Sequence, residues 1–233
     1  MSMSKFISLN FMFKYLDRGY QGSIVLVPGW ATDYRIFDSL NLKFNYLLPF
    51  DLSPSTFESS ILNALGKQGI GKISLLGWSL GGFLAAELSA KYPNLVEELI
   101  LVSIRRKYKK KEIEEIKELL KKSKKGYLYK FYGQCFFKQE NLSWFKKNLL
   151  KTYCEQFDLE YLLKTLDYLE KAQINTQELL GIERIKIIHG ESDEIAPIDE
   201  AREVQEAIAG AELITIKNSG HIPFLEADLG KYI

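Results

Sequence analysis

Apolar runs rich in Val, Ile and Leu recur along the chain and predict buried strands. Runs of this length without polar alternation are typical of strands covered on both faces, and helix-length stretches separate most of them. We therefore expect an α/β protein with a mainly parallel central sheet flanked by helices. One helix start is marked by Ser55, a candidate N-cap with Glu58 at the capping-box position. The strand-like runs occupy residues 22–28, 44–48, 72–76, 96–102, 184–188 and 212–216, and residues 6–15 suggest one or two short edge strands.

The alternation of strands and helices is interrupted once, between residues 105 and 183. This stretch is charged, aromatic and helix-prone, and about 75 residues pass there without a convincing strand. We predict a helical lid over 105–183, inserted into an α/β core made of 1–104 and 184–233. A length of 233 residues suits one domain with an insertion of this kind.

Candidate chemistry lies first in the segment Gly77-Trp78-Ser79-Leu80-Gly81-Gly82, directly after the run 72–76. A G-x-S-x-G pattern between a strand and a helix is typical of a nucleophile elbow, a turn so tight that side chains at the glycines would collide with the backbone. Such a turn would expose the Ser79 hydroxyl above the sheet and aim the Leu80 N–H at negative charge near it. The pattern alone also arises by chance in about one chain in ten, as a turn that only packs a helix on a sheet.

Two later segments supply the partners that an elbow serine needs, in the required order of acid and then histidine. Asp193 follows the run 184–188, and His221 follows the run 212–216. Both lie where a strand ends, at the edge of a parallel sheet where ligands bind. We predict that Ser79, Asp193 and His221 form a catalytic triad.

Other residues compete for these roles. His189 is the only other histidine, and its place at the end of a strand favours support of the loop over service as the base. Glu191 and Glu194 flank Asp193 and are alternative acids; solvated loop carboxylates are the simpler interpretation of both. Two backbone N–H groups are needed for an oxyanion, and we expect them from Leu80 and Trp30. The chemistry requires no metal and no organic cofactor.

The charge of the chain is unevenly distributed, although its net value is only +1. Residues 105–151 hold 16 Lys and Arg against 5 Asp and Glu, a net +11, and the rest of the chain carries −10. A basic surface at a site entrance favours an acidic partner. A solvated helix face paired with nearby glutamates is the plainer alternative, and nucleic acid or an anionic membrane are others. The predicted partner contacts are Arg105, Arg106, Lys107, Lys109 and Lys110.

Aromatic residues are candidates for binding an acyl chain beneath the lid. We expect substrate contacts from Trp30, Trp78, Phe131, Phe137 and Trp144, while Tyr132, Phe136 and Phe145 are further candidates for an apolar channel. Ordinary packing of the lid on the core is an equally good interpretation of each one taken singly.

The remaining features favour a cytoplasmic location, and we expect a monomer, although no feature of the sequence marks the oligomeric state. No apolar run approaches the ~20 residues of a membrane helix, and residues 1–6 lack the layout of a signal peptide. Cys135 and Cys154 suggest neither a disulfide framework nor a zinc site. We expect no nucleic-acid partner and no stable membrane insertion.

These motifs resemble the α/β-hydrolase superfamily over residues 23–103 and 184–225. The finer resemblance is to the carboxylesterases of biotin synthesis that cleave pimeloyl-acyl-carrier-protein methyl ester. It implies the α/β-hydrolase fold, a triad of Ser79, Asp193 and His221, an oxyanion N–H from Trp30, and basic lid residues that bind the acidic carrier. Many relatives have histidine in place of Pro28, so the geometry of this loop is expected to differ. The resemblance rests on Pro28-Gly29-Trp30, on Gly77 to Gly82, on Gly190, Asp193 and Pro197, and on Gly220-His221 with Pro223-Phe224.

The expected function is therefore that of a serine carboxylesterase, acting on a methyl ester of an acyl chain on acyl carrier protein. A broad short-chain esterase, a thioesterase and a carbon–carbon bond hydrolase use the same triad and remain alternatives. A non-enzymatic binding protein of the same fold is a further one.

Overall fold

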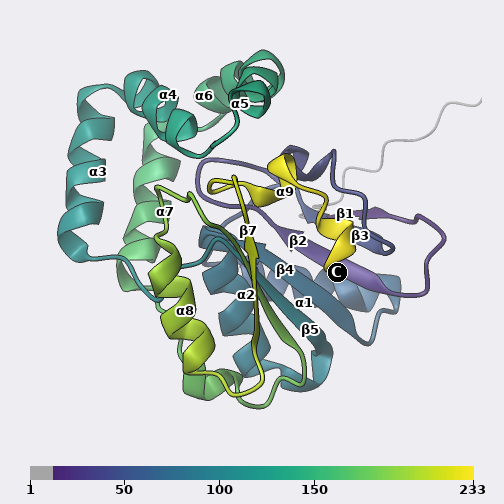
Figure 1. Ribbon diagram of the computed structural model, residues 1–233. Helices are drawn as coiled ribbons and strands as arrows, with labels where there is room; N and C mark the ends of the chain where they lie inside the picture. The colour runs from purple at the N-terminus through teal and green to yellow at the C-terminus, as the bar shows by residue number, and fades with distance from the viewer. Residues whose placement is uncertain (1–12) are drawn as a thin grey trace, which may run out of the picture.

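A single seven-stranded sheet organises the computed structural model, which describes residues 13–233 (Figure 1). Its spatial order is β1-β3-β2-β4-β5-β6-β7; β1 is antiparallel to β3, and every other neighbouring pair is parallel. The prediction of a mainly parallel sheet is confirmed. The strands are β1 (Phe13–Leu16), β2 (Ser23–Val27), β3 (Asn45–Pro49), β4 (Ile73–Trp78), β5 (Val96–Val102), β6 (Ile185–Gly190) and β7 (Glu212–Ile216).

Burial explains why the central strands read as continuous apolar runs. Every residue of β2, β3 and β4 is buried, whereas most of the edge strand β7 is at least partly exposed. Helix α2 packs on β2, β4 and β5, and α8 packs on β6 and β7. The helices outside the 105–183 segment are α1 (Phe57–Gln68), α2 (Leu80–Lys91), α8 (Ile198–Glu206) and α9 (Pro223–Glu226).

Residues 105–183, called the insertion below, contribute five α-helices and no strand to the central sheet. These helices gather at the top and left of Figure 1, beside the carboxyl ends of the strands. The two ends of the insertion are joined, because Lys107 pairs with Gln173 in an antiparallel bridge and the Ile174 N–H donates to the Arg106 carbonyl at 2.9 Å. The helices are α3 (Lys110–Lys122), α4 (Lys124–Gln134), α5 (Gln139–Phe145), α6 (Lys151–Gln156) and α7 (Leu159–Lys171), with a π-helical turn at Lys146–Leu150.

The start of α1 differs from the expectation, and the edge strand is present only in part of the range expected for it. Ser55 is not the N-cap of α1, since the helix begins one residue later, after Thr56, and the Ser55 hydroxyl instead lies 3.1 Å from the Ser53 hydroxyl. Glu58 lies in the first turn but pairs with Lys91. The expected edge strand is present as β1, and the part of it predicted over residues 6–12 lies outside the described residues.

The turn between β4 and α2 is closed by direct backbone packing. A Cβ at Gly81 would lie 2.3 Å from the Val27 carbonyl oxygen, and a Cβ at Gly77 would lie 2.3 Å from the Gly81 carbonyl oxygen. No L side chain fits at either position without moving β2 or α2. The glycines of the motif therefore set the distance between the start of α2 and the end of β2.

This packing predicts the effect of a single methyl group. Gly81→Ala should lower the free energy of unfolding by about 3 kcal/mol, the upper part of the range for overpacked sites, because the methyl group meets backbone. Gly66→Ala is the matched control: Gly66 lies in α1 with nothing within 4 Å of an added Cβ, so the change should stabilise by about 0.5–1 kcal/mol. Urea unfolding of both variants measures the difference, and equal stabilities would contradict it.

Candidate active site

Ser79 lies at the tip of the turn between β4 and α2 in a strained conformation. Its φ is 53° and its ψ is −117°, a region that residues other than glycine rarely occupy. The turn is held on both sides, because the Ser79 N–H donates to the Val102 carbonyl and the Ser79 carbonyl accepts from the Gly82 N–H. The side chain is thus fixed at the carboxyl edge of the sheet.

His221 and Asp193 reach this serine from the loops that follow β7 and β6. The His221 Nε2 lies 2.9 Å from the Ser79 Oγ, and the His221 Nδ1 lies 2.8 Å from the Asp193 Oδ2. All three side chains are buried. The structure therefore brings the three predicted triad residues into one continuous chain of hydrogen bonds.

The Asp193 carboxylate is well supplied with hydrogen bonds. Its other oxygen accepts from the N–H groups of Ile195 and Ala196, each at 2.8 Å. Burial alone would raise the pKa of Asp193, but the adjacent His221 and His189 and the Ala196 N–H outweigh it and leave that pKa below its usual value. Asp193 is therefore held as the anion that a neighbouring imidazolium needs.

The alternative residues do not enter this chain. The His189 Nε2 lies 2.7 Å from the Ala196 carbonyl and 3.4 Å from the Asp193 carboxylate, and burial lowers the pKa of His189. His189 supports the Asp193 loop without approaching Ser79. Glu191 and Glu194 are exposed, and neither contacts His221.

The backbone of His221 is anchored at both ends. Its N–H donates to the Cys135 carbonyl at 2.8 Å, and its carbonyl accepts from the Trp78 indole N–H at 2.7 Å. Trp78 itself packs against Gly29, where a Cβ would come within 2.9 Å of its ring. The histidine is thus held from the insertion on one side and from β4 on the other.

Two backbone N–H groups are available for an anion beside Ser79. Within residues 13–233, the N–H groups of Leu80 and Trp30 donate to no other protein group. Leu80 is the first residue of α2, where the helix dipole adds a positive partial charge. Leu80 directly follows Ser79 in the chain, and Trp30 lies in the loop after β2.

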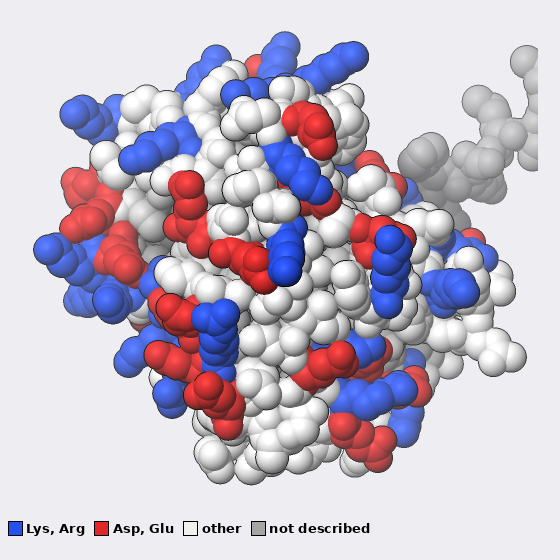
Figure 2. Space-filling model, in the orientation of Figure 1, with Lys and Arg blue, Asp and Glu red and all other residues white. Residues whose placement is uncertain are grey.

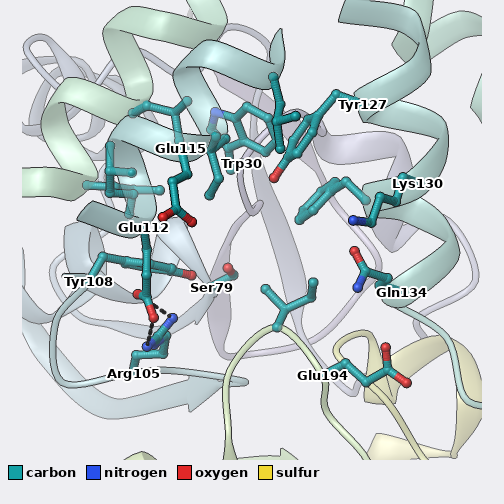
Figure 3. A pocket seen from close by; sticks show the side chains of 17 residues that line it. Trp30, Ser79, Arg105, Tyr108, Glu112, Glu115, Tyr127, Lys130, Gln134 and Glu194 are labelled. Atoms are coloured by element: carbon teal, nitrogen blue, oxygen red, sulfur yellow. Dashed lines mark hydrogen bonds and ion pairs between the residues drawn. The ribbon is translucent and has the colours of Figure 1, made fainter. Parts of the chain in front are cut away.

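A cavity of about 450 Å³ opens beside Ser79, between the core and the insertion (Figure 3). This volume lies in the range of small-molecule sites. The side chains that α3 and α7 contribute to its wall are mostly apolar. Charged side chains, among them Arg105, Glu112 and Lys130, also line the cavity. The lining residues include Trp30, Ser79, Arg105, Tyr108, Ile113, Ile116, Leu119, Tyr127, Lys130, Phe131, Leu166, Leu169 and Ile195.

Comparison with known proteins agrees with this arrangement. The family model described as alpha/beta hydrolase fold matches residues 53–158. A pimeloyl-[acyl-carrier protein] methyl ester esterase from Nitrosomonas europaea is 28% identical over 228 residues, which cover 87% of this chain and 89% of that one. The chain has the α/β-hydrolase fold.

Solved structures show the same fold at low sequence identity. An esterase from Exiguobacterium antarcticum aligns with a TM-score of 0.78 at 21% identity, over 92% of this chain and 90% of that one. A bromoperoxidase from Bacillus anthracis aligns with a TM-score of 0.81 at 17% identity, over 94% and 92% of the two chains. The family match and the esterase relative, together with this fold, indicate an enzyme that hydrolyses esters.

Three of the predicted substrate contacts lie outside the lining of this cavity. Trp78 is buried behind His221, and Phe137 and Trp144 are largely exposed. Trp144 borders a separate surface pocket with Ser39, whose lining does not include Ser79. Trp30 and Phe131 do line the cavity of this hydrolase, and their rings meet edge to face at 5.1 Å.

Arg105 does not belong to the predicted partner surface. Its side chain is buried, pairs with Glu200 at 2.7 Å and with Glu112 at 3.2 Å, and lines the cavity, so it is not a surface contact. Arg106, Lys107, Lys109 and Lys110 are exposed as expected. Lys110 lies near carboxylates of the insertion, 3.7 Å from Glu114 and 3.9 Å from Glu170.

Tyr108 is a site residue that the sequence did not reveal. Its hydroxyl points toward Ser79 across the cavity (Figure 3), and the Arg105 guanidinium lies 4.6 Å from its ring centre. Burial raises the pKa of Tyr108 to about 12, so the hydroxyl remains a donor at ordinary pH. In the sequence it stands inside the basic run, where nothing distinguishes it from a surface residue.

Neither a metal cluster nor a membrane helix is found in the described part of the chain. No group of three or more His, Cys, Asp or Glu side chains there could hold a metal ion. None of its helices has both the length and the apolar character needed to span a bilayer.

The position of Tyr108 predicts a hydrogen bond that matters to catalysis. Tyr108→Phe should lower kcat/KM about 3- to 10-fold, the value of one hydrogen bond of about 0.5–1.5 kcal/mol. Because the pKa of Tyr108 is about 12, the ratio of wild type to variant should stay constant between about pH 6 and pH 9. Tyr127→Phe, at the cavity wall, should change kcat/KM less than about twofold. A ratio that falls toward pH 9 would count against the assignment.

Proposed function

We propose that this α/β hydrolase is a serine carboxylesterase whose substrate is the methyl ester of a pimeloyl chain on acyl carrier protein. The observation that carries the catalytic part is the chain of hydrogen bonds from Ser79 through His221 to Asp193. The relative from Nitrosomonas europaea supports the substrate, since the alignment covers most of both chains. The apolar part of the cavity wall beside Ser79 is consistent with an acyl chain.

The proposed reaction proceeds through an acyl-enzyme. The Ser79 Oγ attacks the ester carbonyl carbon while its proton passes to the His221 Nε2. The tetrahedral oxyanion accepts hydrogen bonds from the Leu80 and Trp30 N–H groups. His221 then returns the proton to the leaving alkoxide, which departs as methanol. A water activated by His221 hydrolyses the acyl-enzyme and restores the Ser79 hydroxyl.

Asp193 would keep the imidazole in the productive tautomer. Its carboxylate accepts the Nδ1–H, which leaves Nε2 free to take the serine proton. Its lowered pKa supports this role, because a carboxylate that stays ionised stabilises the imidazolium formed during the attack. Asp193 itself need not take up a proton.

The basic surface proposed for the carrier lies on α4 and α6 and on the π-helical turn before α6. In residues 13–233, no carboxylate pairs with Lys125, Lys147 or Lys151, all of which are exposed. The lysines of α3 differ, since several of them face glutamates of their own helix. Figure 2 agrees: blue predominates at the top, over α4 to α6, while blue and red alternate on the left, over α3.

A panel of esters tests the catalytic proposal. The wild-type protein should hydrolyse methyl pimeloyl-carrier protein and short p-nitrophenyl esters, and Ser79→Ala should lower kcat about 10⁴-fold or more on both. Thermal unfolding of Ser79→Ala confirms that the variant is folded. Full activity in Ser79→Ala would exclude the proposed nucleophile, whereas turnover only of thioesters would select a thioesterase.

Charge reversal tests the carrier separately. The triple variant Lys125→Glu, Lys147→Glu and Lys151→Glu should raise KM for the carrier-bound ester about tenfold and leave a small neutral ester unaffected, because only the carrier meets this surface. The control reverses Lys43, Lys72 and Lys217, which are exposed on the core. Equal effects of the two triple variants on the carrier-bound ester would contradict recognition by α4 and α6.

A further inference from the structure

Glu226 is a buried carboxylate outside the hydrogen-bond chain of Ser79, His221 and Asp193. It is the last residue of α9, five residues beyond His221, and only 6% of its surface is exposed. In the part of the chain that the structure describes, its carboxylate forms no ion pair. A charge buried in this way is tolerated only when hydrogen bonds replace its water.

Four hydrogen bonds surround this carboxylate, and they divide between its two oxygens. Oε1 accepts from the N–H groups of Phe137 and Lys138, at 2.9 and 2.7 Å. Oε2 accepts from the Ser219 hydroxyl at 3.1 Å and from the Gly220 N–H at 2.5 Å. An ionised carboxylate has about four acceptor positions, so the group is saturated.

Each oxygen therefore serves a different segment. Oε1 holds the turn between α4 and α5, which belongs to the insertion, and Oε2 holds the residues directly before His221. The same two segments touch again where the His221 N–H donates to the Cys135 carbonyl. A Cβ on Gly220 would lie 2.7 Å from that carbonyl oxygen, so the contact is close enough to exclude any side chain.

We infer that Glu226 is a positioning residue, which clamps the His221 loop to the turn at residues 135–138 and so sets the distance from the imidazole to Ser79. The inference rests on the proposed catalytic role of His221. It also identifies residues 135–138 as a point at which the insertion is fixed to the core.

Glu226→Gln tests the clamp with almost no change of volume. The amide keeps one acceptor and turns two donors toward N–H groups, so one of the two segments loses its partner. We expect kcat on p-nitrophenyl acetate to fall about 10- to 100-fold, in line with the cost of a misplaced catalytic group, with KM changed less than about threefold. Rates are counted per active site, from burst titration with a fluorophosphonate, so that a smaller folded fraction does not imitate the effect.

Two further measurements separate positioning from a merely structural role. In proton NMR, the His221 Nδ1–H signal should shift or broaden in Glu226→Gln. In hydrogen exchange, the Gly220 amide should lose protection together with the Phe137 or Lys138 amide. Asp228→Asn is the matched control. Among the described residues, this carboxylate two positions further on accepts a hydrogen bond only from the nearby Gly230 N–H, at 3.0 Å, so the variant should behave as wild type.

The outcomes are distinct. A Glu226→Gln enzyme with a lower melting temperature but unchanged kcat and Nδ1–H signal would overturn the inference and leave the catalytic role of Ser79 intact. If that variant does not fold, Ser219→Ala removes a single donor to Oε2 and should lower kcat about threefold at constant KM. An unchanged kcat in Ser219→Ala would then overturn it. Activity retained in Ser79→Ala would instead remove the proposed function.

Discussion

The hydrogen bond between Ser79 and His221 joins residues 142 positions apart, and it can form only where the parallel strands end together. In this sheet, β4, β6 and β7 all run in the same direction, so the loops that follow them emerge at one edge. Reversal of any one of these strands would carry its loop to the opposite edge. The directions of the strands are in turn maintained by the crossovers through α2 and α8 and by the burial of their apolar faces.

Several charged groups are buried near this hydrogen bond, and the surrounding structure supplies the partners that each of them needs. Asp193 is buried but has two backbone N–H donors and an imidazole. Glu226 is buried with four donors, and Arg105 with two carboxylates. Each of these groups would be costly alone, and each ties together segments that are distant in sequence. The hydrogen bonds that satisfy these buried polar groups therefore also fix the shape of the site.

The fold and the three hydrogen-bonded residues could be predicted because their signals are local. A run such as 72–76 is apolar for the same reason that β4 is buried, and the glycines around Ser79 are required by a backbone contact within one turn. Asp193 and His221 were accessible through their places after strands. These features need only a few neighbouring residues to be recognised.

The other residues of the site depend on contacts that the sequence does not display. Tyr108 and Arg105 look like members of a basic surface run, and only the ion pairs of Arg105 with Glu200 and Glu112 and its stacking on the Tyr108 ring reveal their place at the cavity. Trp144 and Phe137 carry the right chemistry, but Trp144 lies on an exposed side of α5 and Phe137 is exposed in the turn before that helix. Glu226 looks like an ordinary helix-end carboxylate until the turn at 135–138 is placed against it.

The antiparallel bridge between Lys107 and Gln173 brings the two ends of the insertion together where the chain leaves and re-enters the core. A segment that leaves and re-enters a scaffold at neighbouring points can change length or sequence without shifting the strands on either side. Proteins that evolve from such a chain could therefore acquire a new specificity by replacement of the whole insertion. Any replacement would still have to present a carbonyl and two amides to the histidine loop, and to reproduce the hydrogen bonds that Tyr132, Tyr153 and Leu162 form with the loop after β2.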